Sequence, residues 1–560
     1  MAEIKKHWYK EMAVYQVWPR SFYDGNGDGI GDIKGVMEKL DYIKSIGVDA
    51  IWFSPLYKSP QNDYGYDIAD YKSIAPEYGT LEEFKELLDA AHSKGLRVIM
   101  DLVINHTSNE HEWFKESEKS KDSPYHDYYF WRKGKKPNGK KPPNNWISTF
   151  AGPGWHYNEN LDEWYLTLFC KEQPDLNMDN PKVREEIKDI IRFWLDMGVD
   201  GFREDVITFI SKREGLPNGF PIPVACGMEH YKCGPNLDKY LREFRAVTDN
   251  YDCMTVGEAP MMTPKLALRF IKEGAGQTLN MMFNFQHMEA DSFMVSWVPM
   301  PFSLKKLKNA YDRWQHKLYG IAWNANYIEN HDQPRVINRY GSTKYRVESG
   351  KMLATMYICQ SGTPFIYQGQ EIGMLNVPME SVDEYTDTQV KSTYQLFKKL
   401  GISDKTFLKI SNRASRDNAR TPVQWTAEKN AGFTTADKAW FKVNPNYTEI
   451  NVEAAEKDEN SLLNYYRKLL KFRKENEVCI YGDFKQHYKS SKKLFVYERN
   501  YEGKRMLVIN SFVEDGVSFT APKGFDLSKG KLVLSNYEVI DSSVNTFMTK
   551  PYETRVYLFD

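Results

Sequence analysis

Short apolar runs alternate with longer amphipathic stretches over most of the chain. Apolar runs without interspersed polar residues are typical of parallel strands that are covered on both faces. They predict eight strands, at residues 13–19, 50–56, 97–103, 203–205, 254–259, 279–285, 325–331 and 363–369. Apolar residues recurring every three or four positions predict eight helices, at 32–46, 81–93, 181–195, 236–247, 264–272, 303–316, 344–358 and 461–475. This alternation indicates an α/β fold, and eight strand–helix pairs predict a closed (β/α)8 TIM barrel.

Three stretches break the alternation and divide the chain. Residues 104–174 are rich in Lys, Pro, Asn, Trp and Tyr and are too long for a plain loop, so we expect a small domain inserted after strand three. The barrel would then comprise residues 1–103 and 175–479, with a polar excursion at 371–455. Short alternating strands at 493–498, 505–510 and 555–559 predict a C-terminal antiparallel β-sandwich domain over residues 480–560.

Composition narrows the classes of function. A net charge of −1 gives no bias toward nucleic acid or an acidic membrane as partner. The chain has no apolar run of the roughly 18 residues that span a membrane, and its first residues lack the apolar core of a signal peptide. The six cysteines show no CxxC spacing and are expected to be reduced, mostly buried thiols. We therefore expect a monomeric cytoplasmic enzyme.

A loop early in the chain carries an oxygen side chain at every second position, with glycines between them. The side chains of Asp24, Asn26, Asp28 and Asp32 and the carbonyl of Ile30 form the first part of an EF-hand-like loop. The terminal bidentate Glu of a true EF-hand is missing. The spacing predicts a structural Ca²⁺ or Mg²⁺ site that takes no part in chemistry; the alternative is a Gly/Asp turn without metal.

The segment GVDGFREDV at 198–206 reads as a short buried strand that ends in charged residues. Residues two apart on a strand share a face, so Arg203 lies beside Asp205. A neighbouring guanidinium is expected to lower the pKa of this carboxyl and keep it ionised, as a nucleophile requires. The alternative is a buried Arg–Asp pair that only fixes a loop.

Other polar residues at predicted strand ends favour the functional interpretation, because catalytic groups of a barrel lie at the C-terminal ends of its strands. His106 follows strand three, Glu258 ends strand five, and His331 and Asp332 end strand seven. Cleaving a glycosidic bond needs one ionised and one protonated carboxyl group. Asp205 suits the first role, and Glu258, whose sequence neighbours are apolar, suits the second. Asp332 would accept hydrogen bonds from sugar hydroxyls, and the two histidines would donate them.

Five motifs carry a resemblance to a known family: QPDLN at 173–177, DLVINH at 101–106, GFREDV at 201–206, TVGEAP at 255–260 and ENHDQPR at 329–335. The sequence resembles the α-amylase superfamily of glycoside hydrolases, and within it the oligo-1,6-glucosidase/α-glucosidase group, over nearly the whole chain. The resemblance implies a retaining double displacement through a covalent glucosyl–enzyme. In it Asp205 is the nucleophile, Glu258 the acid/base and Asp332 the stabiliser of the transition state.

The resemblance also implies how the sugar is held. The family's residues that orient the sugar at subsite −1 correspond to Arg203, His106 and His331 in this sequence. Asp63 matches a carboxylate that holds the terminal glucose, Tyr66 matches a stacking ring, and Arg420 matches the partner of that carboxylate. Phe169 would add a further wall. A pocket closed behind the non-reducing end makes the enzyme exo-acting, so that it releases one glucose at a time.

Linkage preference depends on Val206, because in this group Val after the nucleophile goes with α-1,6 cleavage and Thr or smaller residues go with α-1,4 cleavage. Two residues depart from the group. Glu204 replaces a usually apolar residue and needs a partner in the helix layer, and Glu329 could change acceptor preference if it reached the +1 site. The RLDRD stretch of sucrose isomerases is absent; the matching region is 338–341.

The leading hypothesis is an exo-α-glucosidase that acts on isomaltose and short isomalto-oligosaccharides. Broad α-glucosidase activity, or a sucrose-active or transglycosylating enzyme on the same fold, is the alternative, because water and a sugar hydroxyl compete for the same intermediate. A non-catalytic relative, such as a transporter-associated subunit or a carbohydrate-binding protein, would not need Asp205 and Glu258 together.

Overall fold

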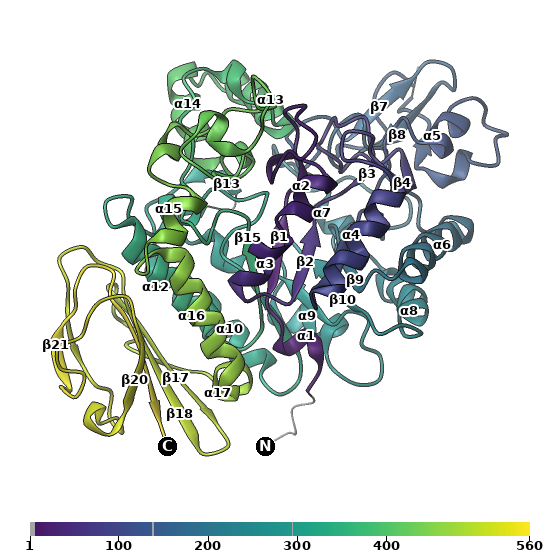
Figure 1. Ribbon diagram of the computed structural model, residues 1–560. Helices are drawn as coiled ribbons and strands as arrows, with labels where there is room; N and C mark the ends of the chain where they lie inside the picture. Colours follow the sequence, from purple (N-terminus) through teal and green to yellow (C-terminus); the bar gives the residue numbers. More distant parts are fainter. Residues whose placement is uncertain (1–5, 137–138, 294) are drawn as a thin grey trace.

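Eight parallel strands close a barrel in the computed structural model, which describes residues 6–136, 139–293 and 295–560. Their order around the barrel is β1-β15-β14-β11-β10-β9-β5-β2 (Figure 1). The strands are β1 (Val14–Val17), β2 (Ala50–Phe53), β5 (Arg97–Leu102), β9 (Gly201–Glu204), β10 (Met254–Glu258), β11 (Met281–Phe283), β14 (Trp323–Asn326) and β15 (Thr363–Tyr367). The predicted TIM barrel is confirmed.

Helices surround the barrel where apolar residues recur at helical spacing. They are α2 (Ile33–Glu38), α3 (Leu40–Ile46), α4 (Leu81–Ser93), α6 (Pro181–Met197), α8 (Leu237–Thr248), α9 (Pro264–Ile271), α10 (Leu304–Leu318), α12 (Arg346–Ile358) and α16 (Leu462–Glu475). The single helix predicted at 32–46 is two helices. Lys39 leaves helical geometry there, with φ −103° and ψ 7°, and its N–H bonds to Val36 and Met37.

Two strand ends differ from the prediction in a way that matters for the site. Strand seven was predicted to run to residue 331 but ends at Asn326, so His331 and Asp332 lie in the loop beyond it. Asp205 follows the last residue of β9 and does not belong to the strand. Some polar residues of the site therefore lie at the ends of strands and others lie in the loops that follow them, as in other barrels.

Large side chains fill the barrel interior. The ring of Trp52 lies 5.6 Å from that of Phe283 and 6.2 Å from that of Phe365, so strands β2, β11 and β15 meet through their aromatic side chains. The Arg203 guanidinium lies 5.3 Å from the Trp52 ring. This layer supports Arg203 from below, because the interior is a packed core and not a pore.

Residues 104–174 include a three-stranded antiparallel sheet of order β6-β8-β7 and the helix α5 (Glu112–Ser117). The strands are β6 (Trp131–Arg132), β7 (Trp155–Asn158) and β8 (Glu163–Leu166). The excursion at 371–455 carries α13 (Thr388–Lys399) and α14 (Asp404–Ala414), which lie above the strand ends on the opposite side of the barrel mouth from β7 and β8 (Figure 1).

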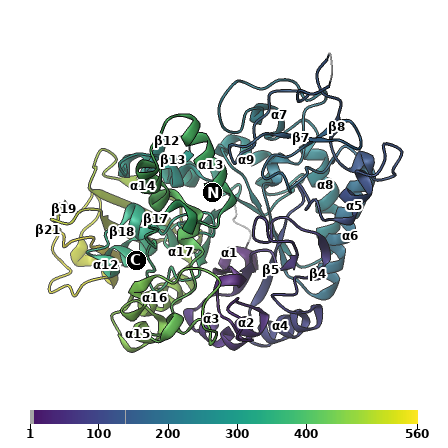
Figure 2. The same cartoon turned by 90° about the horizontal axis from the view of Figure 1, so that it is seen from above.

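The C-terminal residues form a five-stranded antiparallel sheet of order β16-β17-β18-β22-β20, with a two-stranded sheet of β19 and β21 beside it. The strands are β16 (Lys485–His487), β17 (Leu494–Tyr501), β18 (Lys504–Ser511), β19 (Ser518–Thr520), β20 (Lys531–Ser535), β21 (Thr546–Met548) and β22 (Thr554–Phe559). Phe519 of the small sheet shares an apolar cluster with Val496 and Ile509 of the large one. This domain and the β7–β8 sheet lie on opposite sides of the barrel (Figures 1 and 2).

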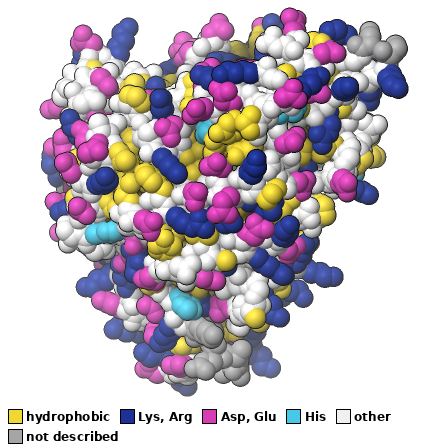
Figure 3. All heavy atoms as spheres, turned by 90° about the vertical axis from the view of Figure 1, so that its right-hand side faces the viewer, with side chains coloured by type: hydrophobic (Ala, Val, Ile, Leu, Met, Phe, Trp, Pro, Cys, Tyr) yellow, Lys and Arg dark blue, Asp and Glu magenta, His cyan; other side chains and the backbone are white. Residues whose placement is uncertain are grey.

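Acidic and basic side chains are interspersed over the face that includes the inserted sheet (Figure 3), in keeping with a net charge of −1 for the chain. Among the described residues, no helix combines the length and the apolar character that crossing a membrane requires.

Candidate active site

Arg203 joins three carboxylates at the C-terminal ends of adjacent strands. Its Nη1 lies 2.7 Å from Asp101 Oδ1 and 2.7 Å from Asp205 Oδ1, and its Nη2 lies 2.7 Å from Glu258 Oε2. The register explains the meeting, because Arg203 is the partner of Asp101 on β5 and of Val256 on β10. The two predicted catalytic carboxylates thus share one guanidinium. Asp101 was not predicted to be a site residue, although it too is a carboxylate near the C-terminal end of a predicted strand.

The pKa of Asp205, one of three carboxylates that share one guanidinium, differs from the prediction. Burial raises the pKa of Asp205 well above its ordinary value, Arg203 lowers it, and the carboxylates of Glu258 and Asp101 raise it further. Arg203 does lower this pKa, but burial, which is the largest contribution, outweighs it together with the neighbouring carboxylates, so the net lowering that we predicted is not found. Burial likewise raises the pKa of Asp101 to about 6. Two carboxyl groups this close, Asp101 and Asp205, titrate as a unit.

Glu258 does not lie in the apolar setting that its sequence neighbours indicated. Its Oε2 accepts hydrogen bonds from Arg203 and from the backbone N–H of Val206, at 3.2 Å. Val206 has φ +34°, which is uncommon for a β-branched residue. This bend after β9 turns its N–H toward Glu258, while its buried side chain packs in an apolar cluster with Phe209 and Phe130.

His331 and Tyr66 form a buried stack beside the carboxylates, with ring centroids 5.3 Å apart and an angle of 6° between the planes. Gln16 Nε2 donates to His331 Nδ1 at 2.7 Å, so His331 Nε2 carries the proton and donates to the Tyr66 hydroxyl at 2.7 Å. Tyr66 in turn donates to Asp101 Oδ2 at 2.9 Å. Burial lowers the pKa of His331 well below its ordinary value, so the ring is a neutral donor.

The structure corrects the partner of Asp63. Arg420 was predicted to pair with it, but Arg416 Nη2 lies 3.1 Å from Asp63 Oδ1. Arg420 Nη2 instead lies 2.9 Å from Asp332 Oδ1, and its Nε donates to the carbonyl of His331. Arg416 also reaches Asp332, at 3.2 Å, so it spans both carboxylates. Sequence reasoning missed Arg416 because both arginines stand in the same short segment.

The two carboxylates respond differently to this environment. Burial would raise the pKa of Asp332, but His331, Arg416 and Arg420 outweigh burial and hold it well below its usual range. For Asp63 burial outweighs the same two arginines and raises the pKa to about 6. Asp332 is therefore ionised at neutral pH.

His106 lies against the backbone of the Asp63–Tyr66 turn, with its Nε2 3.1 Å from the carbonyl of Tyr66. Burial lowers the pKa of His106 to about 3. Phe169 stands beside it, with ring centroids 5.1 Å apart. Gln173, from the QPDLN motif, donates to Asp63 Oδ2 at 3.2 Å, a contact that the motif could have indicated. All predicted catalytic and substrate residues thus belong to one connected group of side chains.

The two unusual glutamates lie outside this group. Glu204 is buried, and its Oε2 has no hydrogen-bond partner among the described residues, although a partner was expected. Burial raises the pKa of Glu204 to about 8, and Arg245 lowers it only in part. Glu329 is buried too and pairs with Arg335 at 3.1 Å, while its Oε1 accepts from the N–H of Val336. It points to its own loop and not to an acceptor sugar.

In the loop predicted to bind a metal, the acidic side chains accept hydrogen bonds from the backbone of the same loop. Asp24 Oδ1 accepts from the N–H groups of Asn26 and Gly27, and Asp32 Oδ2 accepts from that of Asn26. Asp28 Oδ1 accepts from the N–H of Ile30. These atoms are the hard oxygen donors that Ca²⁺ and Mg²⁺ take, and each keeps a further lone pair. In the described ranges no three His, Cys, Asp or Glu side chains are arranged to hold a metal.

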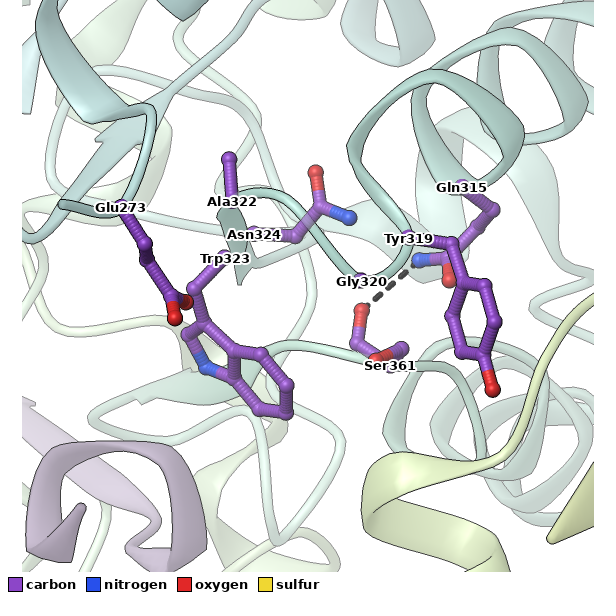
Figure 4. A pocket seen from close by; sticks show the side chains of 8 residues that line it. All are labelled: Glu273, Gln315, Tyr319, Gly320, Ala322, Trp323, Asn324 and Ser361. Carbon is purple, nitrogen blue, oxygen red and sulfur yellow. Dashed lines mark hydrogen bonds between the residues drawn. The ribbon is translucent and has the colours of Figure 1, made fainter. Parts of the chain in front are cut away.

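A small cavity lies at the opposite end of the barrel, beside the start of β14. Its volume is about 10 Å³, roughly the room of one water molecule and far less than a sugar needs. Gln315 Nε2 crosses to the carbonyl of Ser361 at 2.8 Å (Figure 4). The lining residues are Glu273, Gln315, Tyr319, Gly320, Ala322, Trp323, Asn324 and Ser361.

Comparison with known proteins agrees with this geometry. Residues 16–482 match the α-amylase catalytic domain. An oligo-1,6-glucosidase of Halalkalibacterium halodurans is 48% identical over 99% of both chains. The trehalose-6-phosphate hydrolase of Bacillus licheniformis is 42% identical, with a TM-score of 0.94 over 99% of this chain and 100% of that one. The isomaltulose synthase of Klebsiella sp. LX3 is 38% identical, with a TM-score of 0.95 over 99% of both. The chain belongs to the α-amylase family of glycoside hydrolases.

Proposed function

We propose that this enzyme is an exo-acting, retaining α-glucosidase that hydrolyses the α-1,6 bonds of isomaltose and short isomalto-oligosaccharides from the non-reducing end. The observation that carries the proposal is the shared guanidinium, since Asp205 and Glu258 both lie 2.7 Å from terminal nitrogens of Arg203. Two carboxyl groups held by one side chain can reach the same sugar carbon, as a retaining mechanism requires. The oligo-1,6-glucosidase relatives, 46–48% identical, support the linkage.

In the first step Asp205 attacks the anomeric carbon, and Glu258 gives its proton to the glycosidic oxygen, so that the leaving sugar departs as an alcohol. In the second step Glu258, now ionised, takes a proton from water, whose oxygen attacks the same carbon and releases Asp205. Asp332, ionised at neutral pH, would accept hydrogen bonds from sugar hydroxyls. Two inversions give overall retention.

The exo mode follows from the carboxylates and arginines behind the catalytic pair. Arg416 spans Asp63 and Asp332, and Gln173 binds Asp63 from the other side. All four side chains come from loops beyond the strand ends, and together they would bind the hydroxyls of a terminal glucose. Because each charge already has a partner, this wall is preorganised and would stop a longer chain from continuing beyond the terminal glucose.

Glucose release from isomaltose, maltose, trehalose, trehalose 6-phosphate and sucrose tests the proposal. We expect isomaltose to give the highest kcat/KM, with α-glucose as the first product seen by NMR. A clear preference for maltose would contradict the argument from Val206, and β-glucose as first product would contradict the retaining mechanism.

Sucrose isomerisation is the second candidate, because the isomaltulose synthase has nearly the same fold. The region that matches the isomerase stretch includes Arg339, which is buried and binds Asp291 at 2.6 Å and the carbonyl of Met288. These contacts hold Arg339 within the protein and favour hydrolysis. Isomaltulose formed from sucrose without equivalent glucose and fructose would identify an isomerase.

We also propose that the loop from Asp24 to Asp32 binds a structural Ca²⁺ or Mg²⁺. The side-chain oxygens of Asp24, Asn26, Asp28 and Asp32 and the carbonyl of Ile30 would hold it, and the cation would brace the loop without entering the reaction. Thr434 of the excursion donates to Asp24 Oδ2, so the loop is linked to the segment that carries Arg416.

The enzyme is further proposed to be a cytoplasmic monomer. The six cysteines are free thiols, which suits a reducing compartment. Light scattering of the purified chain and activity measurements on separated cell fractions test the two statements; a dimer mass or activity confined to the culture medium would contradict them.

A further inference from the structure

Two cysteines from distant parts of the chain meet where the barrel joins the C-terminal domain. Cys359 caps the C-terminus of α12, and Cys479 lies in the short helix α17 (Glu477–Tyr481). Both are fully buried, and the Sγ of Cys479 lies 3.9 Å from the carbonyl oxygen of Ile358, the residue before Cys359. Nη1 of Arg499 donates to the carbonyl oxygens of both residues, at 3.0 Å for Cys479. One nitrogen can reach both carbonyls only because the two backbones lie close together.

Two buried guanidiniums flank this pair. Arg473 of α16 donates to the carbonyls of Ile358, Gly362 and Cys479, at 3.0, 2.7 and 3.3 Å. Arg499 likewise donates to backbone carbonyls, and in the described part of the chain neither guanidinium forms an ion pair with a carboxylate. Buried charges are normally neutralised by a partner of opposite charge. The acidic groups that interact with these two arginines include the thiols, together with the hydroxyls of Tyr497 and Tyr357.

The arginines give the two thiols different properties. Burial would raise the pKa of Cys479, but the hydrogen bond from Cys359 and the charges of Arg473 and Arg499 outweigh it and lower the pKa to about 7. The pKa of Cys359 is raised, first by the hydrogen bond to Cys479 and then by burial. By contrast, burial raises the pKa of Cys253 to about 12. An ionised thiol beside a protonated one is the arrangement that thiol–disulfide exchange uses.

We propose that Cys359 and Cys479 are a redox-sensitive dithiol that closes into a disulfide between α12 and α17, where the barrel meets the C-terminal domain. The Cys479 thiolate attacks one sulfur of a small-molecule disulfide, forms a mixed disulfide and releases one thiolate. Cys359 then loses its proton, attacks the Cys479 sulfur and releases the second thiolate, which takes up the proton. Two protein thiols are oxidised and one external disulfide is reduced to two thiols.

The bond would connect elements that already pack together. α12 packs against α16, and α17 packs against β17 and β18, so the disulfide would join α12 to the short helix on which the first long strands of the next domain pack. Since both sulfurs are buried, exchange proceeds through local opening of this junction and is slower than at an exposed thiol. The site lies at the opposite end of α12–β15 from the catalytic mouth, so oxidation acts on stability and not on the chemical step.

The experiment equilibrates the full-length enzyme in glutathione buffers of increasing oxidised fraction, quenches with acid, alkylates free thiols and maps peptides by mass spectrometry. We expect one disulfide, Cys359–Cys479, formed reversibly and accompanied by a rise of several degrees in the unfolding midpoint. Cys359→Ala and Cys479→Ala lose both the bond and the rise, whereas Cys226→Ala, a buried cysteine elsewhere, keeps both. Free thiols at 359 and 479 at the most oxidising ratio, at a temperature just below unfolding, would overturn the proposal.

A second measurement keeps the proposal testable if the alanine variants fold poorly. Thiolate absorbance near 240 nm is followed against pH in the reduced enzyme and in Arg473→Gln, with retained glucose release as the check on folding. We expect a thiolate to appear near neutral pH in the native sequence and at higher pH in Arg473→Gln, since one guanidinium is lost. Equal titration curves for the two proteins would contradict the role given to the arginines.

Discussion

At the scale of single residues, the site depends on Arg203. A guanidinium has five donors in a rigid fork, so it can hold several carboxylates at once. Arg203 uses this capacity to bring Asp101, Asp205 and Glu258 together in the barrel interior. The consequence is that the neighbouring carboxylates raise the pKa of Asp205, in addition to the effect of burial.

Replacing either catalytic carboxylate tests this arrangement. We expect Asp205→Asn and Glu258→Gln each to lower kcat by at least about 10³-fold, because one removes the nucleophile and the other the acid. Circular dichroism should be unchanged, since each amide keeps the shape of the acid. Activity above a tenth of the native value in either variant would contradict the assignment.

Glu204 destabilises the folded protein more strongly as the pH rises. Its folded-state pKa of about 8 lies above the ordinary 4.5, so the folded protein binds this proton more tightly than the unfolded chain. The stability associated with the protonated form is complete below about pH 4.5 and is lost as pH rises through 8. Relative to Glu204→Gln, the native protein should lose up to about 1.4 kcal/mol per pH unit in this window.

Urea unfolding of the native protein and of Glu204→Gln between pH 5 and 9 measures this difference, with exposed Glu82→Gln as control. The gap between native and Glu204→Gln should widen with pH and then level off above about 8. A gap that does not depend on pH would mean that Glu204 has a partner in solution.

At the scale of elements, the excursion between β15 and α16 completes the pocket. Asp387, the N-cap of α13, binds Arg416 through both carboxylate oxygens, to Nε at 2.9 Å and to Nη2 at 2.5 Å. Asp417 accepts the N–H groups of Thr386 and Asp387 and so fixes the turn before the helix. The start of α13 therefore orients the Arg416 guanidinium toward Asp63 and Asp332.

Asp387→Asn should loosen this arginine while keeping the helix cap, since Asn caps as well as Asp. We expect KM for isomaltose to rise about tenfold with kcat within a factor of two to three, because ground-state and transition-state binding weaken alike. Asp404→Asn, on the exposed start of α14, is the control. A fall in kcat without a change in KM would instead place Asp387 in the chemical step.

The loop from Asp24 to Asp32 is the second element with a testable property. If a cation balances its carboxylates, dialysis against EDTA should lower the unfolding midpoint by several degrees, and added Ca²⁺ should restore it by binding only the folded state. Asp28→Asn should respond less than the native protein. Identical midpoints with and without chelator would leave the loop as a turn held by its backbone hydrogen bonds alone.

At the scale of the whole molecule, the C-terminal domain is attached to the barrel by buried polar contacts as well as apolar ones. Lys308 of α10 is fully buried, and its Nζ donates to the carbonyls of Tyr488, Ser491 and Leu494 at 2.7, 2.8 and 3.1 Å. A single ammonium group thus satisfies three carbonyls at the edge of the other domain. Removing it leaves these acceptors without their donor.

Lys308→Met should lower the free energy of unfolding by about 2–4 kcal/mol, through loss of three hydrogen bonds to a charged group. Lys305→Met, on the exposed face of the same helix, should change it by less than about 0.5 kcal/mol. Thermal unfolding gives the comparison, and glucose release at 25 °C should be equal in all three proteins. Equal midpoints would show that apolar packing alone holds the domain.

Local pattern was sufficient for the elements of the fold. Each apolar run that predicted a barrel strand is part of one, because a strand covered on both faces must be apolar throughout. The pattern failed where a local break was decided by contacts, as at Lys39, whose Nζ lies 3.8 Å from the Tyr23 ring and 4.7 Å from the Trp425 ring. It also extended strand seven too far, since buried loop residues such as Ile328 are as apolar as a strand.

The sequence by itself determined which strands lead into polar residues, and therefore that Asp205, Glu258 and Asp332 meet Arg203, His106 and His331 at one mouth, although Asp205, His331 and Asp332 lie just beyond their strands. Strand parity and barrel closure are enough for that. Only the tertiary structure decided how the charges are shared: Asp101 and Glu258 compete with Asp205 for one guanidinium, and Arg416, not Arg420, pairs with Asp63. The reason is that a pKa and an ion pair depend on distances between groups far apart in the chain, which local pattern does not contain.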